Sequence, residues 1–300
     1  MTNLITILGP TATGKTKLAA QLAHKYNGEI ISADSRQVYI GMDIGTGKDF
    51  SDYIINQQQI KYHLINVIHP SEEFNLFMFK ELFAKAFNEI TSRGKLPFLV
   101  GGTGLYISSI IQNYDLKKAD FDSNKIAELE NKSLDELRQL TTKLIPNIHV
   151  KRDLMSKERM IKAILVAEAD ERIKNFPKIN SLVIGIKLER DEVKRRITER
   201  LKKRLSEGMI EEVKRLLDSD ISFQRLESFG LEYKFISQYL AGKIGYDEMF
   251  QKLNTAIHHF AKRQMTWFRK MEREGIKIEW LNGADFEKAC AMIEENIRQQ

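Results

Sequence analysis

Residues Leu4 to Lys17, LITILGPTATGKTK, determine how the rest of the chain is interpreted. A short apolar run, Leu4–Leu8, precedes Gly9-Pro10-Thr11-Ala12-Thr13-Gly14-Lys15-Thr16, and a helical pattern follows. This is the phosphate-binding loop pattern G-x-x-x-x-G-K-[ST] with a strand before it and a helix after it. Its glycines let backbone N–H groups turn toward an anion, and the helix N-terminus adds positive potential. The segment therefore predicts a di- or triphosphate site in which Lys15 is a point charge and Thr16 ligates Mg²⁺.

The composition is that of a globular protein with a partner of opposite charge. The chain has 300 residues, of which 42% are hydrophobic and 29% charged, and a formal net charge of +6. This excess favours an anionic partner such as a nucleic acid. A single cysteine, Cys290, excludes an internal disulfide and a thiolate metal cluster. No apolar run is long enough to cross a bilayer, so we expect a cytoplasmic protein that does not bind membranes.

Alternating strand and helix patterns predict an α/β fold of the P-loop NTPase type. Short apolar runs predict strands at residues 4–8, 29–33, 62–67, 96–100, 182–188 and 276–280. Helical periodicity predicts helices after residue 15 and at residues 74–93, 191–217, 223–239, 246–273 and 285–297. Strands joined through helices form parallel sheets, so we expect a parallel sheet of about five or six strands covered by helices on both faces.

The pattern changes over residues 113–179, where charged helical segments at 124–144 and 156–174 are not interrupted by a strand. We predict a helical insertion domain there. The P-loop catalytic core would then consist of residues 1–112 and 180–300.

Two more segments are expected beside the phosphate loop. Asp34 follows the second predicted strand, and the Gly101-Gly102-Thr103-Gly104 turn follows the fourth. Ligands of open parallel sheets bind outside the carboxyl ends of the strands, so topology brings both segments to the same sheet edge. The most basic helix, residues 191–217, is either a solvated face or a lid whose arginines close on phosphates.

A phosphate loop alone is compatible with several activities. A GTPase needs a base-specificity motif of the N-K-x-D type, which is absent from the sequence. A motor ATPase needs an apolar strand that ends in paired acids, whereas residues 96–100 lead into Gly-Gly-Thr. A small-molecule kinase stays open, with Asp34 as the base for a hydroxyl nucleophile.

Five motifs, taken together, closely resemble the bacterial tRNA dimethylallyltransferases, also called tRNA isopentenyltransferases. In order they are Gly9-Pro-Thr-Ala-Thr-Gly-Lys-Thr16, Ile31-Ser-Ala-Asp-Ser-Arg-Gln-Val-Tyr39, Gly41-Met-Asp-Ile-Gly-Thr46, Val100-Gly-Gly-Thr-Gly-Leu-Tyr106 and Ala261-Lys-Arg-Gln-Met-Thr-Trp267. The match extends from the first strand to Trp267, with looser similarity through Trp280. Five motifs at consistent spacing are far more specific than any one of them.

This resemblance implies a particular use of the phosphate loop. In the family the loop holds the diphosphate of dimethylallyl diphosphate, and the five-carbon group passes to N6 of the adenosine next to the tRNA anticodon, position 37. Asp34 occupies the family's general-base position. A base is needed because adenine N6 is a poor nucleophile until it loses a proton. Lys15, Thr16 with Mg²⁺, and Arg200 would hold the leaving diphosphate.

The resemblance also implies contacts with the tRNA anticodon arm. They would involve Asp34-Ser35-Arg36-Gln37, Thr103, and, in the insertion, Glu158-Arg159-Met160-Ile161-Lys162. The resemblance also implies that Thr103 is a catalytic-site residue near the reacting amine; its alternative role is that of a turn hydroxyl that caps a helix. The chain departs from the usual family pattern at Lys162, Ile164, Leu165, Glu232 and His258. We expect a monomer with Mg²⁺ as cofactor and with tRNA and dimethylallyl diphosphate as partners.

Three other functions remain open at this stage. An isopentenyltransferase that acts on free adenine nucleotides would share the loop, but the insertion and the positive charge favour a macromolecular acceptor. A P-loop metabolite kinase and a non-catalytic, nucleotide-gated RNA-binding module are the more distant alternatives.

Overall fold

The computed structural model describes residues 1–119, 122–145 and 156–298. The chain divides into two compact units, one formed by Met1–Asn113 and Pro177–Gln300 and the other by Tyr114–Phe176. We call them the core unit and the insertion unit. In the described residues, no helix has both the length and the apolar character that a bilayer crossing requires.

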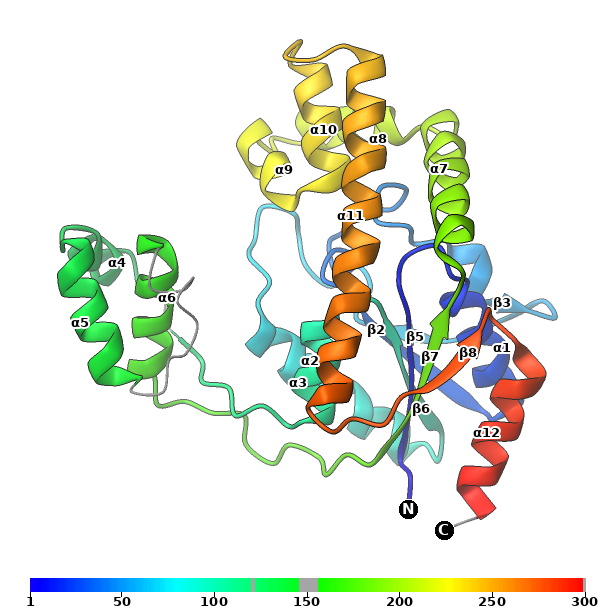
Figure 1. Cartoon of the computed structure of the whole chain (residues 1–300). Helices are drawn as coiled ribbons and strands as arrows, with labels where there is room; N and C mark the ends of the chain where they lie inside the picture. Colours follow the sequence, from blue (N-terminus) through cyan, green and yellow to red (C-terminus); the bar gives the residue numbers. More distant parts are fainter. Residues whose placement is uncertain (120–121, 146–155, 299–300) are drawn as a thin grey trace. The chain divides into compact units, whose positions relative to one another are not determined.

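A six-stranded parallel sheet forms the centre of the core unit, as predicted (Figure 1). Its order is β5-β2-β6-β1-β7-β8, and every pairing between neighbours is parallel. The strands are β1 (Leu4–Leu8), β2 (Gly28–Ala33), β5 (Tyr62–His63), β6 (Leu96–Gly101), β7 (Ser181–Lys187) and β8 (Glu279–Asn282). The central strands are buried along their whole length, as expected for a sheet covered on both faces.

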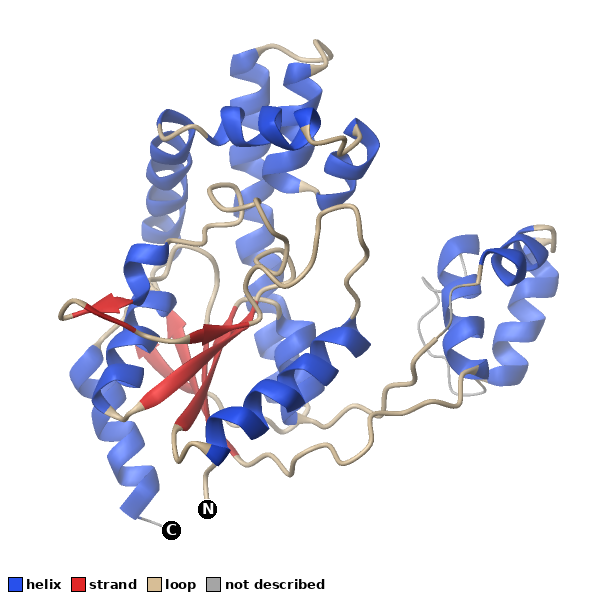
Figure 2. Cartoon of the chain, turned by 180° about the vertical axis from the view of Figure 1, so that it is seen from behind, coloured by secondary structure: helices blue, strands red, loops and turns tan. Residues whose placement is uncertain are grey.

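Helices cover both faces of the sheet (Figures 1 and 2). On one face, α1 (Lys15–Lys25) and α12 (Phe286–Arg298) pack on apolar side chains of β1, β6 and β7 such as Ile7, Phe98 and Ile184. On the other face lie α2 (Leu76–Ser92), α3 (Gly104–Ile111) and the lower part of α11 (Tyr246–Arg273). Each strand turns alternate side chains to the two faces, so both faces of the sheet are apolar.

A group of helices lies above the carboxyl ends of the strands (Figure 1). It comprises α7 (Arg190–Ser206), α8 (Met209–Asp218), α9 (Phe223–Phe229), α10 (Leu231–Leu240) and the upper part of α11. Their shared apolar core includes Leu201, Val213, Tyr233 and Leu253. This group and the sheet edge enclose the cavity that is described below.

Several predicted helices and strands have different bounds in the structure. The helix predicted at 191–217 is two helices because Gly208 adopts φ 98°, a left-handed conformation that interrupts a helix. Gly230, at φ 70°, likewise separates α9 from α10. The strand predicted at 62–67 ends at His63, since Leu64 and Asn66 have positive φ. The last strand lies at Glu279–Asn282 rather than at 276–280.

A small antiparallel hairpin was not predicted. It consists of β3 (Ile54–Ile55) and β4 (Gln58–Gln59), and it follows a 3₁₀ helix at Phe50–Tyr53. Both turn residues, Asn56 and Gln57, have positive φ, as in a type I′ hairpin turn.

The insertion unit contains α4 (Ser123–Glu130), α5 (Leu134–Leu144) and α6 (Lys157–Glu168). The helix predicted at 124–144 is therefore two helices. Ser133 begins the second one with a capping box: its hydroxyl accepts from the Glu136 N–H, and the Glu136 carboxylate accepts from the Ser133 N–H. The helix predicted at 156–174 ends at Glu168, and Lys117 and Arg172 form an isolated antiparallel bridge. Leu129, Leu137, Met160, Ile161, Ile164 and Leu165 form the core of this unit.

Candidate active site

The phosphate loop joins β1 to α1 and is held by its own backbone and by β7. Ala12 and Gly14 have φ values of 66° and 83°, which turn the loop around its centre. Gly9 lies so close to β7 that a Cβ there would be 2.7 Å from the carbonyl oxygen of Ile186. The buried Thr13 hydroxyl donates to the Pro10 carbonyl at 2.9 Å. These contacts fix the curved conformation of the loop.

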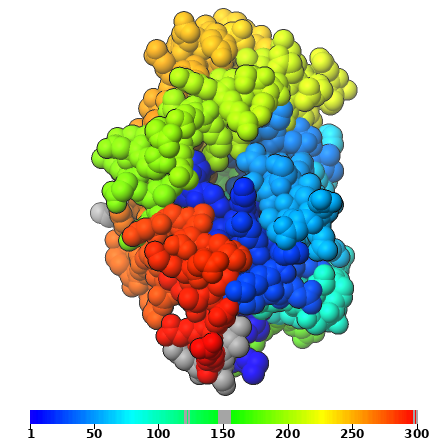
Figure 3. Space-filling view, turned by 90° about the vertical axis from the view of Figure 1, so that its right-hand side faces the viewer, coloured from blue at the N-terminus to red at the C-terminus, as the bar shows by residue number. Residues whose placement is uncertain are grey.

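A cavity of about 340 Å³ opens between this loop and the helices above it. Figure 3 shows the hollow between the green surface of α7, the dark blue surface of the chain's first residues and the lighter blue surface of residues near 50. All lining residues belong to the core unit, namely Thr11, Ala12, Gly14, Lys15, Thr16, Asp34, Ser35, Arg36, Gln37, Gly45, Thr46, Gly47, Asp49, Asp52, Tyr53, Val100, Gly101, Arg196, Arg200, Arg204, Leu231, Glu232, Ile257 and Phe260.

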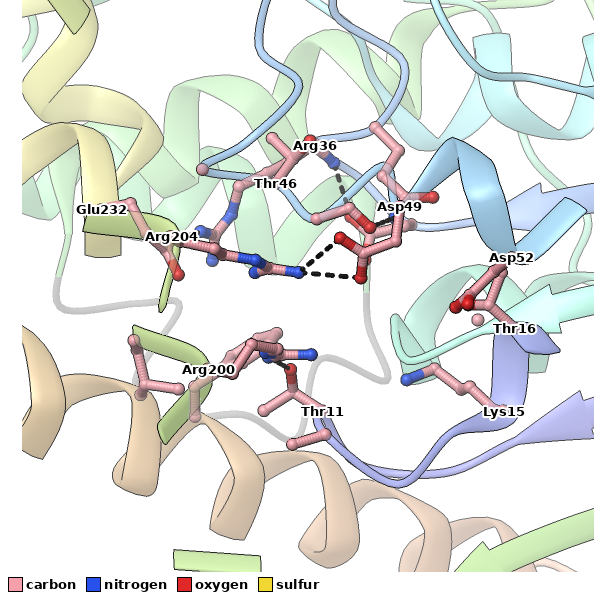
Figure 4. A pocket seen from close by; sticks show the side chains of 18 of the residues that line it. Thr11, Lys15, Thr16, Arg36, Thr46, Asp49, Asp52, Arg200, Arg204 and Glu232 are labelled. Atoms are coloured by element: carbon pink, nitrogen blue, oxygen red, sulfur yellow. Dashed lines mark hydrogen bonds and ion pairs between the residues drawn. The ribbon is translucent and has the colours of Figure 1, made fainter. Parts of the chain in front are cut away.

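One end of the cavity is strongly cationic. Lys15, from α1, and Arg200, from α7, both point into it (Figure 4). Burial, together with the positive charge of Arg200, lowers the pKa of Lys15 to about 8. Burial and the nearby Arg204 lower the pKa of Arg200 to about 10. Both lowered pKa values mean that the site disfavours the charged side chains. A bound anion would stabilise the charged forms and raise both pKa values.

Arginines from one face of α7 form the roof of this end. Arg196, Arg200 and Arg204 are spaced by four residues, so they lie on the same side of the helix. Arg200 donates a hydrogen bond to the Thr11 hydroxyl of the phosphate loop. Arg204 is buried and donates to Asp49 Oδ2 at 3.1 Å. Only Arg200 of the three was predicted as a site residue, although the spacing of four residues also places Arg196 and Arg204 on that side of the helix.

The carboxyl end of β2 supplies Asp34, which lines the cavity and is half-buried. Its Oδ1 accepts a hydrogen bond from the Arg36 backbone N–H at 3.0 Å, which fixes the turn after the strand. The Thr103 hydroxyl accepts from the Ser35 N–H at 3.1 Å. Thr103 precedes α3 but makes no side-chain cap there, and it is not among the residues that line the cavity. Its hydroxyl therefore joins the ends of β2 and β6.

Arg36 and Glu232 line the cavity as well, and Glu232 lies near Arg200 and Arg204 (Figure 4). They form an ion pair of 3.0 Å in which Glu232 is almost buried. The Arg36 guanidinium also lies 5.3 Å from the centre of the Phe260 ring. Glu232, a departure from the usual family pattern, thus fixes one of the side chains predicted to contact tRNA.

Gln264, which was not predicted as a site residue, joins the two glycine-rich turns. Its side chain is buried, accepts from the Thr11 N–H at 2.8 Å and donates to the Gly102 carbonyl at 2.9 Å. One loop amide, that of Thr11, is therefore already bound within the protein. No local pattern in the sequence indicates this contact, since Thr11 and Gln264 are 253 positions apart.

The predicted contact stretch in the insertion, Glu158–Lys162, lies on α6. Glu158 and Lys162 are exposed and form an ion pair of 2.9 Å, and Arg159 is exposed as well. Met160 and Ile161 are buried in the core of the insertion unit, so their side chains serve its packing. The departures at Ile164 and Leu165 belong to the same apolar core.

The cavity offers oxygen ligands of the kind that Mg²⁺ prefers. Thr16, Asp34, Asp49 and Asp52 all line it. Burial and the neighbouring Asp49 raise the pKa of Asp52, so a cation nearby would favour its carboxylate form. Within residues 1–119, 122–145 and 156–298, no group of three or more His, Cys, Asp or Glu side chains is arranged to hold a metal by itself. The Thr16 hydroxyl and these carboxylates are oxygen donors of the type that fits a magnesium ion.

Comparisons with known proteins show the family to which the chain is related. The family model described as IPP transferase matches residues 37–271, and the model described as isopentenyl transferase matches residues 2–69. The chain is 46% identical over 303 residues to tRNA dimethylallyltransferase 1 of Syntrophus aciditrophicus, covering 99% of both chains. It is 49% identical over 286 residues to tRNA dimethylallyltransferase 2 of Syntrophotalea carbinolica, covering 94% of this chain and 95% of the relative.

Solved structures show the same fold. The full-length tRNA isopentenylpyrophosphate transferase of Bacillus halodurans is 34% identical, with a TM-score of 0.70 and coverage of 100% of this chain and 96% of that chain. A eukaryotic dimethylallyltransferase described as acting on tRNA has a TM-score of 0.79 at 22% identity, covering 100% of this chain and 80% of that chain, and this likeness concerns the fold. The matched residues, the identities and the phosphate-loop fold together show that the chain belongs to the IPP transferase family.

Proposed function

We propose that this chain transfers a dimethylallyl group from dimethylallyl diphosphate to N6 of adenosine 37, next to the anticodon of tRNA, and releases diphosphate. The observation that supports it best is a single cavity lined by Lys15 and Arg200, which lie at the phosphate loop, and by Asp34, which follows β2. The cations can bind the leaving anion, and the Asp34 carboxylate can accept the proton that the nucleophile loses. The tRNA-modifying relatives favour a tRNA acceptor.

The proposed reaction forms a C–N bond and breaks a C–O bond. The nitrogen of the adenine attacks the first carbon of the dimethylallyl group, and the electrons of the C–O bond leave with the diphosphate. Asp34 takes the N6 proton as the C–N bond forms, which keeps the nitrogen lone pair available. Lys15, Arg200 and the loop amides other than that of Thr11 stabilise the charge that develops on the diphosphate. When bound by Thr16 and the diphosphate oxygens, Mg²⁺ would neutralise part of that charge.

The five-carbon group needs an apolar surface between these charged ends. Val100, Ile257 and Leu231 line the cavity together with the Tyr53 and Phe260 rings. A cavity with water excluded by such side chains also strengthens the electrostatic contacts of the diphosphate. The tRNA must present its adenine out of the base stack, as enzymes that modify a base require. We propose that Ser35, Arg36, Gln37 and Thr103 on the core unit, and Glu158, Arg159 and Lys162 on the insertion unit, contact the anticodon arm.

A transfer assay tests this function. The protein is incubated with Mg²⁺ and labelled dimethylallyl diphosphate, and with either tRNA or AMP as acceptor. We expect label in tRNA, at position 37 after nuclease digestion and mass analysis. Label that enters AMP but never tRNA would establish the nucleotide isopentenyltransferase instead. Phosphate transfer from ATP would establish a kinase, and RNA binding without turnover would favour a binding module. We further propose that the protein acts as a monomer in the cytoplasm; a dimer in size-exclusion chromatography with light scattering would contradict the monomer.

A further inference from the structure

A buried carboxylate outside the cavity holds the loop that forms one of the cavity walls. Glu212 lies on α8 and is 2% exposed. Its Oε2 accepts hydrogen bonds from the backbone N–H groups of Asp43 at 2.8 Å and Ile44 at 2.6 Å. Its Oε1 accepts from the Gly45 N–H at 3.0 Å and from the Tyr233 hydroxyl at 2.8 Å. Four donors converge on one side chain, so each oxygen accepts two hydrogen bonds.

Tyr233 and Gly45 pack closely around the Glu212 carboxylate. Tyr233, on α10, is wholly buried, and burial together with Glu212 holds the pKa of its hydroxyl well above the usual value, so the hydroxyl stays a donor. A Cβ on Gly45 would lie 2.7 Å from the Tyr233 hydroxyl, which leaves room only for glycine. The three backbone N–H groups, the carboxylate and the phenol thus fit one arrangement.

The loop is fixed from a second side as well. The side chain of Lys48 is fully buried and donates to the Tyr39 carbonyl at 2.6 Å and to Asp43 Oδ1 at 2.8 Å. It also donates to Asn66 Oδ1. Lys48 ties the loop to its own neighbours in the sequence, whereas Glu212 ties it to the helices above the sheet. Glu212 connects residues 43–45 to α8 through hydrogen bonds from three backbone N–H groups, and Ile44 packs on the apolar core that α7 and α8 share.

This loop forms part of the cavity lining. Gly45, Thr46 and Gly47 line it. The Gly47 carbonyl accepts from the Gln37 side chain at 3.1 Å, and Gln37 belongs to the segment that follows Asp34. Gly47 also lies against Arg204, since a Cβ there would be 2.2 Å from the guanidinium. The position of residues 45–47 therefore affects the side chains around the base and those around the diphosphate.

We propose that Glu212 is a positioning residue for the transfer reaction: it holds residues 43–47 as a rigid wall that aligns the Asp34–Gln37 segment with the diphosphate end of the cavity. This inference rests on the proposed function, since the alignment serves that reaction. Glu212 itself does not line the cavity and does not touch the reacting atoms. Its effect passes through the loop backbone.

Glu212→Gln is the informative substitution, because it keeps the shape and removes two acceptor sites. A carboxylate can accept all four hydrogen bonds, whereas an amide offers one oxygen and turns an NH₂ group toward two donors. Glu211→Gln is the matched control, since Glu211 is the preceding, exposed residue of α8. Val213→Ala controls for stability, because Val213 is wholly buried beside Glu212 and belongs to the same apolar core.

The first measurement does not depend on activity. Hydrogen–deuterium exchange of peptides that cover residues 40–48 reports on the amides that Glu212 accepts from. We expect these amides to exchange about tenfold faster in Glu212→Gln than in Val213→Ala, once the two variants are compared at equal distance below their melting temperatures. Equal protection of these amides from exchange in the two variants would contradict the proposal that Glu212 holds residues 43–47. This result would not depend on whether the protein has transferase activity.

The second measurement separates positioning from a general loss of stability. In Glu212→Gln we expect kcat to fall about tenfold or more while KM for dimethylallyl diphosphate changes less than about twofold, because the phosphate loop is held by other contacts. Val213→Ala and Glu211→Gln should keep the wild-type kcat. Loosened loop amides with unchanged kcat would contradict positioning. A wild-type protein that transfers no label would contradict the proposed function instead.

Discussion

The side chain of Gln264 accepts a hydrogen bond from the backbone N–H of Thr11 at a distance of 2.8 Å. The same amide group donates to the Gly102 carbonyl at 2.9 Å, so a residue of α11 fixes the distance between the phosphate loop and the turn after β6. Gly102 allows this close approach, because a Cβ there would lie 2.1 Å from the amide nitrogen of Gln264. The two glycine-rich turns are therefore one structural unit, joined by a side chain that is distant in the sequence.

Replacing this bridge should destabilise the core unit. Gln264→Ala leaves a backbone donor and a backbone acceptor without their partner in a buried place, which costs about 2 kcal/mol in the free energy of unfolding. Urea denaturation measures the change. Gln251→Ala, at an exposed position of the same helix, is the control and should unfold like the wild type. Equal stability of the two variants would show that water replaces the bridge.

Asp34→Asn should separate chemistry from binding. Asparagine keeps an oxygen that can accept from the Arg36 N–H, so the turn after β2 should be retained. It cannot take a proton, and we expect kcat to fall by roughly 10²–10⁴ while the affinity for dimethylallyl diphosphate is kept. Single-turnover kinetics and a binding titration measure the two quantities. Asp218→Asn, an exposed residue of α8, serves as the control, and near-normal turnover in Asp34→Asn would exclude the base role.

Arg200→Ala should weaken both binding and turnover. The guanidinium lies over the phosphate loop and donates to the Thr11 hydroxyl, so its loss removes a charge and two or more donors from the diphosphate end. We expect KM to rise and kcat to fall, each by about tenfold or more. Arg195→Ala removes an exposed arginine of the same helix that pairs with Glu192 and Glu199, and its steady-state kinetics should match the wild type. If Arg200→Ala has the same kinetics as Arg195→Ala, α7 is only a solvated helix.

The affinity for the diphosphate substrate should depend on pH through Lys15. Its pKa of about 8 in the free protein means that the ammonium form is half populated near pH 8, predominates at lower pH and is lost as the pH rises further. Since the bound diphosphate favours the ammonium form, binding above pH 8 takes up a proton, and Kd should rise by up to tenfold per pH unit there. Calorimetric titrations between about pH 6 and pH 9.5 stay below the pKa of Arg200, which is about 10.

Lys15→Met tests the assignment of that pH dependence. The variant should bind dimethylallyl diphosphate more weakly at pH 7, and its Kd should stay flat through pH 8–9.5. A variant that keeps the wild-type slope would assign the proton to another group. Lys17→Met, at the exposed position two residues later in α1, should retain both the affinity and the slope.

The local parts of the site were predictable because they depend on short patterns. A strand, a glycine-rich loop and a helix N-terminus within Leu4–Lys17 specify the anion site, and the order of strands and helices brings Asp34 to the same edge. The helices predicted at 191–217 and 223–239 are broken at Gly208 and Gly230, and both glycines are present in the sequence. Because the apolar periodicity continues across each glycine, the sequence favoured single long helices. The capping box at Ser133 and Glu136 was also visible in the sequence. It starts a new helix at this point, although the charged helical pattern on both sides favoured one continuous helix.

The long-range contacts could not be predicted from the sequence. Gln264 and Glu212 bind backbone groups that lie 253 and 167–169 positions away, and nothing in the flanking residues distinguishes these side chains from solvated ones. Their role comes from burial, which only the packed structure reveals. The same holds for Met160 and Ile161, whose motif indicates a tRNA contact while their side chains form the apolar core of the insertion unit.

The position of β6 between β2 and β1 has a consequence for which substrates this architecture can accept. The strand end that bears Asp34 and the strand end that leads into the phosphate loop are two strand widths apart, which is roughly 9–10 Å. This span is set by backbone hydrogen bonds, so side-chain substitutions cannot shorten it. A different alkyl donor or acceptor must therefore be accommodated by changes in the lining residues. The distance from the departing anion to the nucleophile stays set by the spacing of the strands.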